Sequence, residues 1–230
     1  MKLASLFSGG KDSTYSLFQA VKDGHEIKYL ITFRPKRKDS YMFHHPCIEL
    51  TTLQAESMGI KQIIVDTAGE KEKELDDIEK ILTEIKGDID GIVSGALASN
   101  YQKTRIDNIC RKLGLESLAP LWKIDTEKYW EDLLSNNFTV MITSFASEGL
   151  NDKWLGRIVD AKAVAELKGI RDKSGLHLGF EGGEAESLVL DCPLFKKQLV
   201  VESFEKVIDK TTNSGYIKPT KAYLKEKLKQ

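Results

Sequence analysis

Short apolar runs alternate with helical patterns along the first half of the chain. The apolar runs have the length and composition of buried strands, whereas the segments between them place apolar residues at helical spacing. We predict strands at 3–7, 27–33, 63–65 and 91–94, and helices at 12–22, 49–58, 70–85 and 98–113. This order is typical of an α/β protein with an open parallel sheet.

The second half of the chain has a less regular pattern. We predict helices at 126–134 and 157–168, strands at 138–143, 187–190 and 198–203, and a short charged helix after Pro219. The change in pattern indicates a smaller C-terminal α+β domain, and we divide the chain into domains 1–118 and 119–230. Because no low-complexity linker separates them, we expect the two domains to pack closely.

Composition and charge exclude several classes of protein. Apolar residues make up 41% of the chain, and no apolar run approaches the ~18 residues needed to cross a bilayer. The 34 basic and 35 acidic residues give a net charge of -1, so no overall basic field attracts nucleic acid. The first apolar stretch is too short for a secretory signal, and Cys47, Cys110 and Cys192 are far apart. We therefore expect a cytoplasmic protein with reduced, buried thiols and leave homo-oligomerisation open.

The segment Ser8-Gly9-Gly10-Lys11-Asp12-Ser13 lies between the first predicted strand and the first predicted helix. The amides at the start of a helix lack intrahelical partners and attract phosphate. The two glycines let a ligand approach the backbone, the serine hydroxyls can donate hydrogen bonds, and Lys11 supplies a cation. The segment therefore predicts an ATP-binding turn at the carboxyl edge of the sheet.

The spacing of this turn differs from the Gly-x-x-x-x-Gly-Lys-Ser/Thr loop of common nucleotide hydrolases. It resembles the Ser-Gly-Gly-x-Asp-Ser signature of the PP-loop, or N-type, ATP pyrophosphatases, matched at Ser8, Gly9, Gly10, Asp12 and Ser13. The resemblance implies a sheet of the adenine nucleotide alpha hydrolase-like (HUP) type. It also implies that the turn holds the pyrophosphate part of ATP while an oxygen nucleophile attacks the α-phosphorus.

Five further segments are similar to one branch of this superfamily, the diphthine-ammonia ligases. These segments are 40–44, 94–105, 118–122, 181–187 and 190–195. The resemblance implies an enzyme that adenylates the carboxylate of diphthine, a modified histidine on translation elongation factor two, and lets ammonia displace AMP. ATP, Mg²⁺, ammonium and the elongation factor are then the expected ligands and partners. The chain departs from the family pattern at Phe180, where glycine is usual, at Ala185, where an aromatic is usual, and at Ser187, where threonine is usual.

Adenylation needs positive charge near the α-phosphorus, which Lys11, the helix N-terminus and Mg²⁺ would supply. Asp12 is either a Mg²⁺ ligand or the cap of its own helix. Gly95 either lets the backbone approach the nucleotide or forms a tight turn. Tyr41 and His44 lie after the second predicted strand, where they would cover the nucleotide.

Two other clusters are candidates for substrate binding. Gln102 and Arg105 share a helix face, and Arg105 would pair either with a phosphate or carboxylate or with a surface acid. Glu181, Glu184 and Glu186 surround two glycines; they would bind ammonium, accept its proton or hold Mg²⁺, or form an exposed acidic turn. The catalytic candidates are Lys11, Asp12, Glu184 and Glu186. The substrate-binding candidates are Tyr41, Gln102, Arg105, Glu181 and Glu184.

Two other functions remain open from the sequence. The chain could be a tRNA-modifying PP-loop protein that adenylates a base oxygen, with residues 34–38 as a basic docking patch, although paired cysteines are absent. It could also be a non-catalytic module that changes shape when ATP binds. Adjacent histidines at 44 and 45, without other ligands at suitable spacing, do not predict a metal site.

Overall fold

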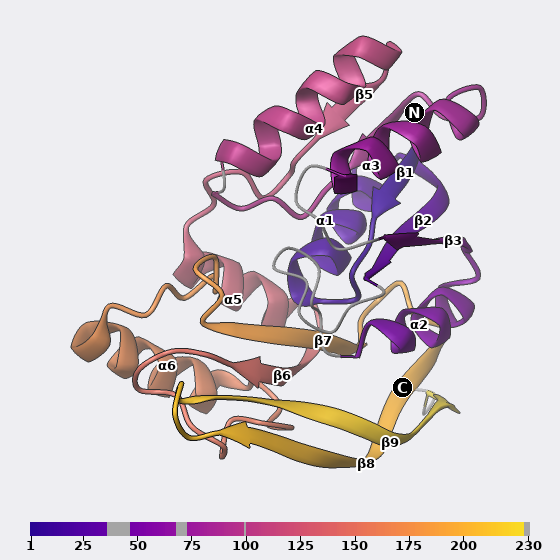
Figure 1. The fold of residues 1–230 in the computed structure, drawn as a ribbon. Coiled ribbons are helices and arrows are strands. Elements are labelled where there is room, and N and C mark those ends of the chain that lie inside the picture. Colours follow the sequence, from indigo (N-terminus) through magenta and orange to yellow (C-terminus); the bar gives the residue numbers. More distant parts are fainter. Residues whose placement is uncertain (36–46, 68–72, 99, 228–230) are drawn as a thin grey trace.

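The computed structural model describes residues 1–35, 47–67, 73–98 and 100–227, which contain two sheets (Figure 1). The strands of the first sheet are β1 (Lys2–Leu6), β2 (Glu26–Pro35), β3 (Lys61–Thr67), β4 (Gly91–Val93) and β5 (Glu116–Leu118). They lie in the order β3-β2-β1-β4-β5, and every neighbouring pair is parallel. The predicted open parallel sheet is confirmed.

Helices cover both faces of this sheet. They are α1 (Lys11–Lys22), α2 (Thr51–Met58), preceded by the 3-10 turn η1 (Ile48–Leu50), α3 (Lys73–Ile85) and α4 (Asn100–Leu113). Ala4 of β1 packs in a cluster with α3 and α4, whereas its neighbour Leu3 packs with Ala20 of α1. Successive strand residues thus serve opposite faces, as a sheet covered on both sides requires. Among the described residues, no helix has the length and apolar character needed to cross a membrane.

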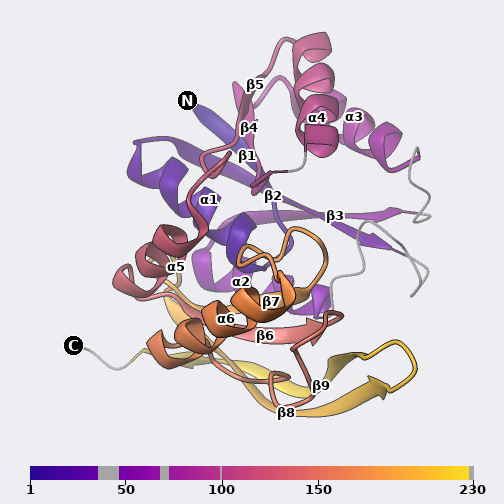
Figure 2. The same cartoon turned by 90° about the vertical axis from the view of Figure 1, so that its left-hand side faces the viewer.

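The second sheet is antiparallel and belongs to the C-terminal half. Its strands are β6 (Thr139–Phe145), β7 (Ala185–Asp191), β8 (Lys197–Asp209) and β9 (Ser214–Glu226), in the order β7-β6-β9-β8. The helices α5 (Thr126–Ser135) and α6 (Ala161–Ser174) accompany it. Figure 2 shows α1 and α2 between the first sheet and this one, with α3 and α4 on the far side of the first sheet.

One hydrophobic cluster joins the two halves. It combines Phe7 and Tyr15 from the N-terminal half with Trp130, Ile142 and Val189 from the C-terminal half. This shared core agrees with the expected close packing. The boundary after residue 118 stays a prediction; the first sheet ends at Leu118 and the second begins at Thr139.

Two predicted helices of the C-terminal half differ from the structure. The helix predicted at 157–168 begins at Ala161, because the Asp160 carboxylate accepts a bond from the Ala163 amide as an N-cap. It ends at Ser174, where Gly175 is the left-handed C-cap. The helix predicted after Pro219 is wrong, because these residues belong to β9. Twelve of the thirteen residues of β9 pair with β8 in a long hairpin, and this pairing overrides the helical preference of a charged segment.

The helices α5 and α6 are joined by an ion-pair network centred on Glu127. Its carboxylate lies 2.5 Å from Arg171 Nη1 and 2.6 Å from Lys168 Nζ. These two bonds, Arg171 first, lower the pKa of Glu127 from its ordinary value of 4.5 to about 2. The two helices therefore share a carboxylate that stays charged in mildly acidic solution.

The lowered pKa of Glu127 predicts a loss of stability in acid. A depressed carboxyl pKa stabilises the fold fully above the unfolded value near 4.5 and ceases to do so as pH falls toward about 2. We expect Glu127→Gln to remove part of the decline in the urea midpoint between those pH values. The same substitution at exposed Glu131 of α5 is the control, and identical pH profiles for Glu127→Gln and the unaltered protein would contradict the prediction.

Candidate functional site

The phosphate turn predicted from the sequence joins β1 to α1. Gly9 has φ +77°, in the left-handed region that favours glycine, and Gly10 is the extended residue before α1. The Gly10 carbonyl accepts bonds from the Thr14 hydroxyl at 2.8 Å and the Ser13 hydroxyl at 3.3 Å. The Ser8 amide donates to Ser13 Oγ at 3.2 Å. The two serines thus fix the turn at the start of the helix, and helix starts in general favour anions.

Strand β7 of the C-terminal half forms hydrogen bonds with the turn. The Gly9 carbonyl accepts bonds from the Val189 amide at 2.9 Å and from Gln54 Nε2 at 3.0 Å. Gln54 Nε2 also donates to the Val189 carbonyl at 2.7 Å, and the Lys11 amide donates to Ser187 Oγ at 3.1 Å. The candidate site is therefore built by both halves of the chain.

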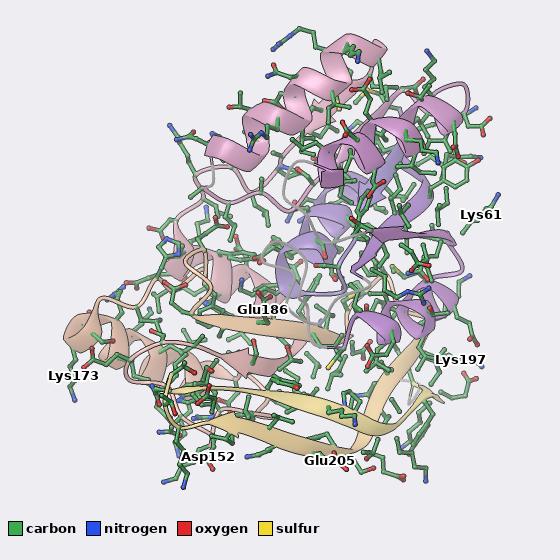
Figure 3. All side chains as sticks on the ribbon, viewed as in Figure 1. Lys61, Asp152, Lys173, Glu186, Lys197 and Glu205 are labelled. Carbon is green, nitrogen blue, oxygen red and sulfur yellow. The ribbon has the colours of Figure 1, made fainter. Side chains whose placement is uncertain are left out.

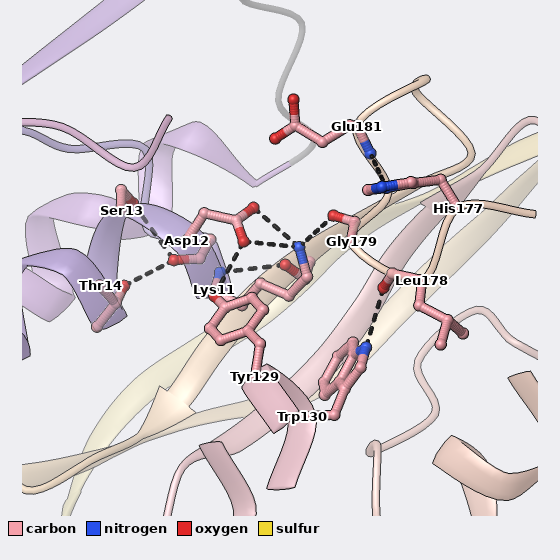
Figure 4. Close-up of polar contacts among 12 residues, drawn as sticks. Lys11, Asp12, Ser13, Thr14, Tyr129, Trp130, His177, Leu178, Gly179 and Glu181 are labelled. Atoms are coloured by element: carbon pink, nitrogen blue, oxygen red, sulfur yellow. Dashed lines mark hydrogen bonds and ion pairs between the residues drawn. The ribbon is translucent and has the colours of Figure 1, made fainter. Parts of the chain in front are cut away.

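Buried Lys11 and partly exposed Asp12 form an ion pair in the first turn of α1 (Figure 4). Lys11 Nζ lies 2.8 Å from both carboxylate oxygens of Asp12 and 2.7 Å from the Gly179 carbonyl. Tyr129 donates its hydroxyl to Asp12 Oδ1 at 2.9 Å. Burial first, and then the charge of Asp12, keep the pKa of Tyr129 well above its ordinary value, so its phenol remains a donor. The Lys11 side chain is 2% exposed and that of Asp12 is 32% exposed, so only the carboxylate reaches solvent.

The acidic segment forms a closed loop next to this pair. The Glu184 carboxylate accepts bonds from the His177 amide at 3.1 Å and the Gly182 amide at 2.8 Å. Glu181 lies over the Lys11–Asp12 pair in Figure 4. The pKa of Glu181 is raised, first because its carboxyl loses part of its water and then because Asp12 carries the same charge. A carboxylate with a raised pKa is a stronger base than an ordinary glutamate.

Glu186 occupies a different position from the other two glutamates. It lies on β7 next to Ser187 and near the centre of the view in Figure 3. Neighbouring residues of a strand point to opposite faces, and Ser187 faces the turn. Glu186 therefore belongs to the other face of β7, and its catalytic role stays a prediction.

The remaining predicted residues are placed as follows. Gly95 packs against the backbone of α1, where a Cβ would lie 2.7 Å from Asp12 C and from Ser13 N. Close approach to the helix accounts for a glycine at this position. Arg105 is half-buried on α4. Tyr41, His44 and the side chain of Gln102 lie outside the described residues, so their roles stay predictions.

Several residues of the site were not predicted from the sequence. Gln54 and Tyr129 are fully buried polar side chains, and their partners are remote in sequence. Phe180 was the one of these residues that the sequence marked as unusual, since the family that the chain resembles usually has glycine there. Its φ of +62° explains that preference, and its buried ring lies 6.0 Å from Trp130 and 5.1 Å from Lys11 Nζ.

The three cysteines lie away from this chemistry. All three are free and buried, as predicted. Burial raises the pKa of the Cys110 thiol to about 11 and that of Cys192 to about 12, and it also raises the pKa of Cys47. Protonated thiols are weak nucleophiles, so a cysteine intermediate is not supported.

A parallel sheet with a glycine turn between its first strand and α1 has the architecture of the PP-loop type of α/β nucleotide-binding protein. The sequence matches the family description "Diphthamide synthase N-terminal domain" over residues 1–117 and "Diphthamide synthase C-terminal domain" over residues 125–224. The chain belongs to the diphthamide synthase family. The resemblance to the diphthine-ammonia ligases is confirmed.

Known proteins agree with this membership along almost the whole chain. A diphthine-ammonia ligase of Homo sapiens is 34% identical over 99% of this chain and 94% of its own length. The protein of the same name from Danio rerio is 32% identical over 99% of this chain and 98% of its own length. The one from Schizosaccharomyces pombe is 33% identical, with 99% of this chain matching 40% of a longer protein. A solved structure described as a predicted subunit of tRNA methyltransferase from Methanocaldococcus jannaschii has a TM-score of 0.46 and 18% identity, covering 84% of this chain and 98% of that one.

Proposed function

We propose that this chain is a diphthine-ammonia ligase that converts the carboxylate of diphthine on translation elongation factor two to the amide. The observation that carries the proposal is its similarity, at 34% identity over 99% of the chain, to a human protein of that name. The site supports it, because the glycine turn contacts the loop that carries Glu181 and Glu184 through the bond from Lys11 Nζ to the Gly179 carbonyl. This arrangement suits a reaction between ATP and an amine.

In the proposed first step, a carboxylate oxygen of diphthine attacks the α-phosphorus of ATP and pyrophosphate leaves. The turn from Ser8 to Ser13 would hold the pyrophosphate through its amides and hydroxyls. Ammonia then attacks the carbonyl carbon, the carbon-oxygen bond breaks, and AMP leaves with one former carboxylate oxygen. Adenylation is needed because a free carboxylate is a poor electrophile.

Asp12 fits a ligand of Mg²⁺. Its carboxylate is partly exposed, and Oδ2, which accepts the Lys11 bond, has a second lone-pair position. Magnesium usually binds one or two carboxylates together with substrate phosphates, and it neutralises charge that develops on them. Among the described residues no group of three or more potential metal ligands exists, so the phosphates would complete the coordination.

Glu181 is the candidate to take the proton that ammonia loses. Its raised pKa brings it closer to neutrality than an ordinary glutamate, and it lies beside the Lys11–Asp12 pair. Glu184, in contrast, accepts hydrogen bonds from two backbone amides and would stabilise the conformation of the loop. Free ammonium is the proposed nitrogen donor.

Isotopic labelling tests the adenylate directly. We expect Mg-ATP, ammonium and the elongation factor bearing ¹⁸O-labelled diphthine carboxylate to give AMP that carries one ¹⁸O, with pyrophosphate and amidated protein. Mass spectrometry of the nucleotide and of the protein measures both products. Omission of ammonium is the control for amidation. Formation of ADP with the label in inorganic phosphate would contradict the proposal, because the acyl group would then have been phosphorylated.

A further inference from the structure

The ammonium of Lys11 has its hydrogen bonds fully committed to the protein. An ammonium has three N–H donors. In this structure Lys11 Nζ lies 2.8 Å from Asp12 Oδ1, 2.8 Å from Asp12 Oδ2 and 2.7 Å from the Gly179 carbonyl. A bond to phosphate would therefore require one of these bonds to break.

Burial makes such a change costly. Lys11 is 1% exposed, and its ammonium lies 5.1 to 6.0 Å from the ring centroids of Phe180, Tyr129 and Trp130. Aromatic faces attract a cation but give it no hydrogen bonds. An ammonium in such surroundings depends on its carboxylate partner, because a buried unpaired charge is strongly unfavourable.

The partners of Lys11 come from both halves of the candidate site. Asp12 lies in the first turn of α1 beside the phosphate turn, whereas Gly179 belongs to the loop that carries Glu181 and Glu184. Glu181 accepts a further bond from the Ala98 amide, near Gly95. The described residues thus attach this loop to the N-terminal half through the Lys11 ammonium and through the Ala98 amide.

We infer that Lys11 is a positioning residue, which orients the Asp12 carboxylate and holds the 177–184 loop against the phosphate turn without contacting the phosphates of ATP. The inference rests on the proposed function for the reaction that it serves. It replaces the role of phosphate-binding cation that the sequence pattern predicts for this lysine.

Lysine acetylation tests whether Lys11 is inaccessible to solvent in the unaltered protein. Brief treatment with acetic anhydride, followed by mass spectrometry, reports which lysines are exposed to solvent. We expect Lys11 to remain unlabelled both with and without inorganic pyrophosphate, while exposed Lys61 reacts in both samples. Labelling of Lys11 in the free protein would overturn the inference, whether or not pyrophosphate protects it.

Substitution separates positioning from phosphate binding. We expect Lys11→Met to change the Kd for pyrophosphate, measured by calorimetry without magnesium, by less than about threefold while kcat for AMP release falls at least about tenfold. Tyr129→Phe removes the other bond to Asp12 Oδ1. It should also lower kcat and should leave the Kd for pyrophosphate unchanged. Lys28→Met, the same change at a lysine paired with Glu26 on the surface, is the control.

A phosphate-binding lysine would give a different result. Loss of a charge-assisted bond to phosphate would raise the Kd for pyrophosphate about tenfold or more, and that outcome would overturn the inference. If Lys11→Met does not fold, the acetylation experiment and Tyr129→Phe still decide. If the unaltered protein forms no AMP, the proposed function fails, whereas the labelling pattern and the pyrophosphate Kd still report on Lys11.

Discussion

Replacement of Gly95 by alanine is expected to abolish most ATP-dependent turnover. The new Cβ would lie 2.7 Å from Asp12 C, 2.7 Å from Ser13 N and 3.0 Å from the Asp12 carbonyl oxygen. These are backbone atoms at the start of α1, so they cannot swing aside as a flexible side chain does. Relief of the contact must displace either the loop after β4 or the helix start that forms the phosphate turn.

We expect Gly95→Ala to lower the free energy of unfolding by about 1–3 kcal/mol, as in an overpacked core. Because about 1 Å of displacement at a reacting group reduces catalysis about 100-fold, turnover should fall by at least that factor. Urea denaturation and AMP release measure the two effects.

Gly169→Ala is the control for this substitution. This glycine is exposed on α6, and its added Cβ has no heavy atom within 4 Å. Replacement inside a helix should raise the free energy of unfolding by about 0.8–1 kcal/mol without changing turnover. Normal turnover in Gly95→Ala, with the predicted gain in Gly169→Ala, would show that the approach of residue 95 to α1 is not needed for activity.

Gly9→Ala is expected to have the second large effect. A Cβ at this residue would lie 2.2 Å from Gln54 Oε1, and the backbone has φ +77°. Gln54 cannot turn away easily, since it is fully buried and its Nε2 bonds the carbonyls of Gly9 and Val189. We expect the free energy of unfolding to fall by about 2–4 kcal/mol, with about 1 kcal/mol from the left-handed backbone and the rest from the collision.

Two comparisons separate these contributions. Gly24 has φ +83° and open space around its Cβ position, so Gly24→Ala should show the backbone effect alone. The double variant Gly9→Ala with Gln54→Ala should lose less than the sum of the single variants by at least about 0.5 kcal/mol, because the colliding atom is absent. Strict additivity in urea denaturation would mean that Gln54 is not the obstacle. Binding of Mg-ATP by each variant reports on the turn itself.

Sequence predicted the parts of the fold that depend on local order. The alternation of strand and helix in the first half sufficed for the parallel sheet, and the Ser-Gly-Gly-Lys-Asp-Ser turn was found because glycines, hydroxyls and a helix start adjoin in sequence. Asp160 and Gly175 bound α6 by local capping, yet the prediction missed its limits. A cap signal is short and competes with many similar residues nearby.

Contacts between remote residues could not be predicted in the same way. Gln54 donates a hydrogen bond to Val189, which lies 135 residues away in the sequence. Tyr129 donates one to Asp12, 117 residues away. Neither glutamine nor tyrosine at these positions differs from a common helix residue until the two halves are packed. The charged segment after Pro219 illustrates the same limit, since its strand conformation depends on pairing with β8.

The attachment of the phosphate turn to β7 has a consequence for the nascent protein. The Gly9 carbonyl is bonded by the amide of Val189, which the ribosome adds 180 residues later (189 minus 9). At roughly 5–20 residues per second, Val189 is added about 10–40 s after Gly9. The turn lacks this hydrogen bond during that time. We expect a stalled chain that ends near residue 120 to have the first sheet but to bind no nucleotide, so ATP capture would begin only after β7 has been translated.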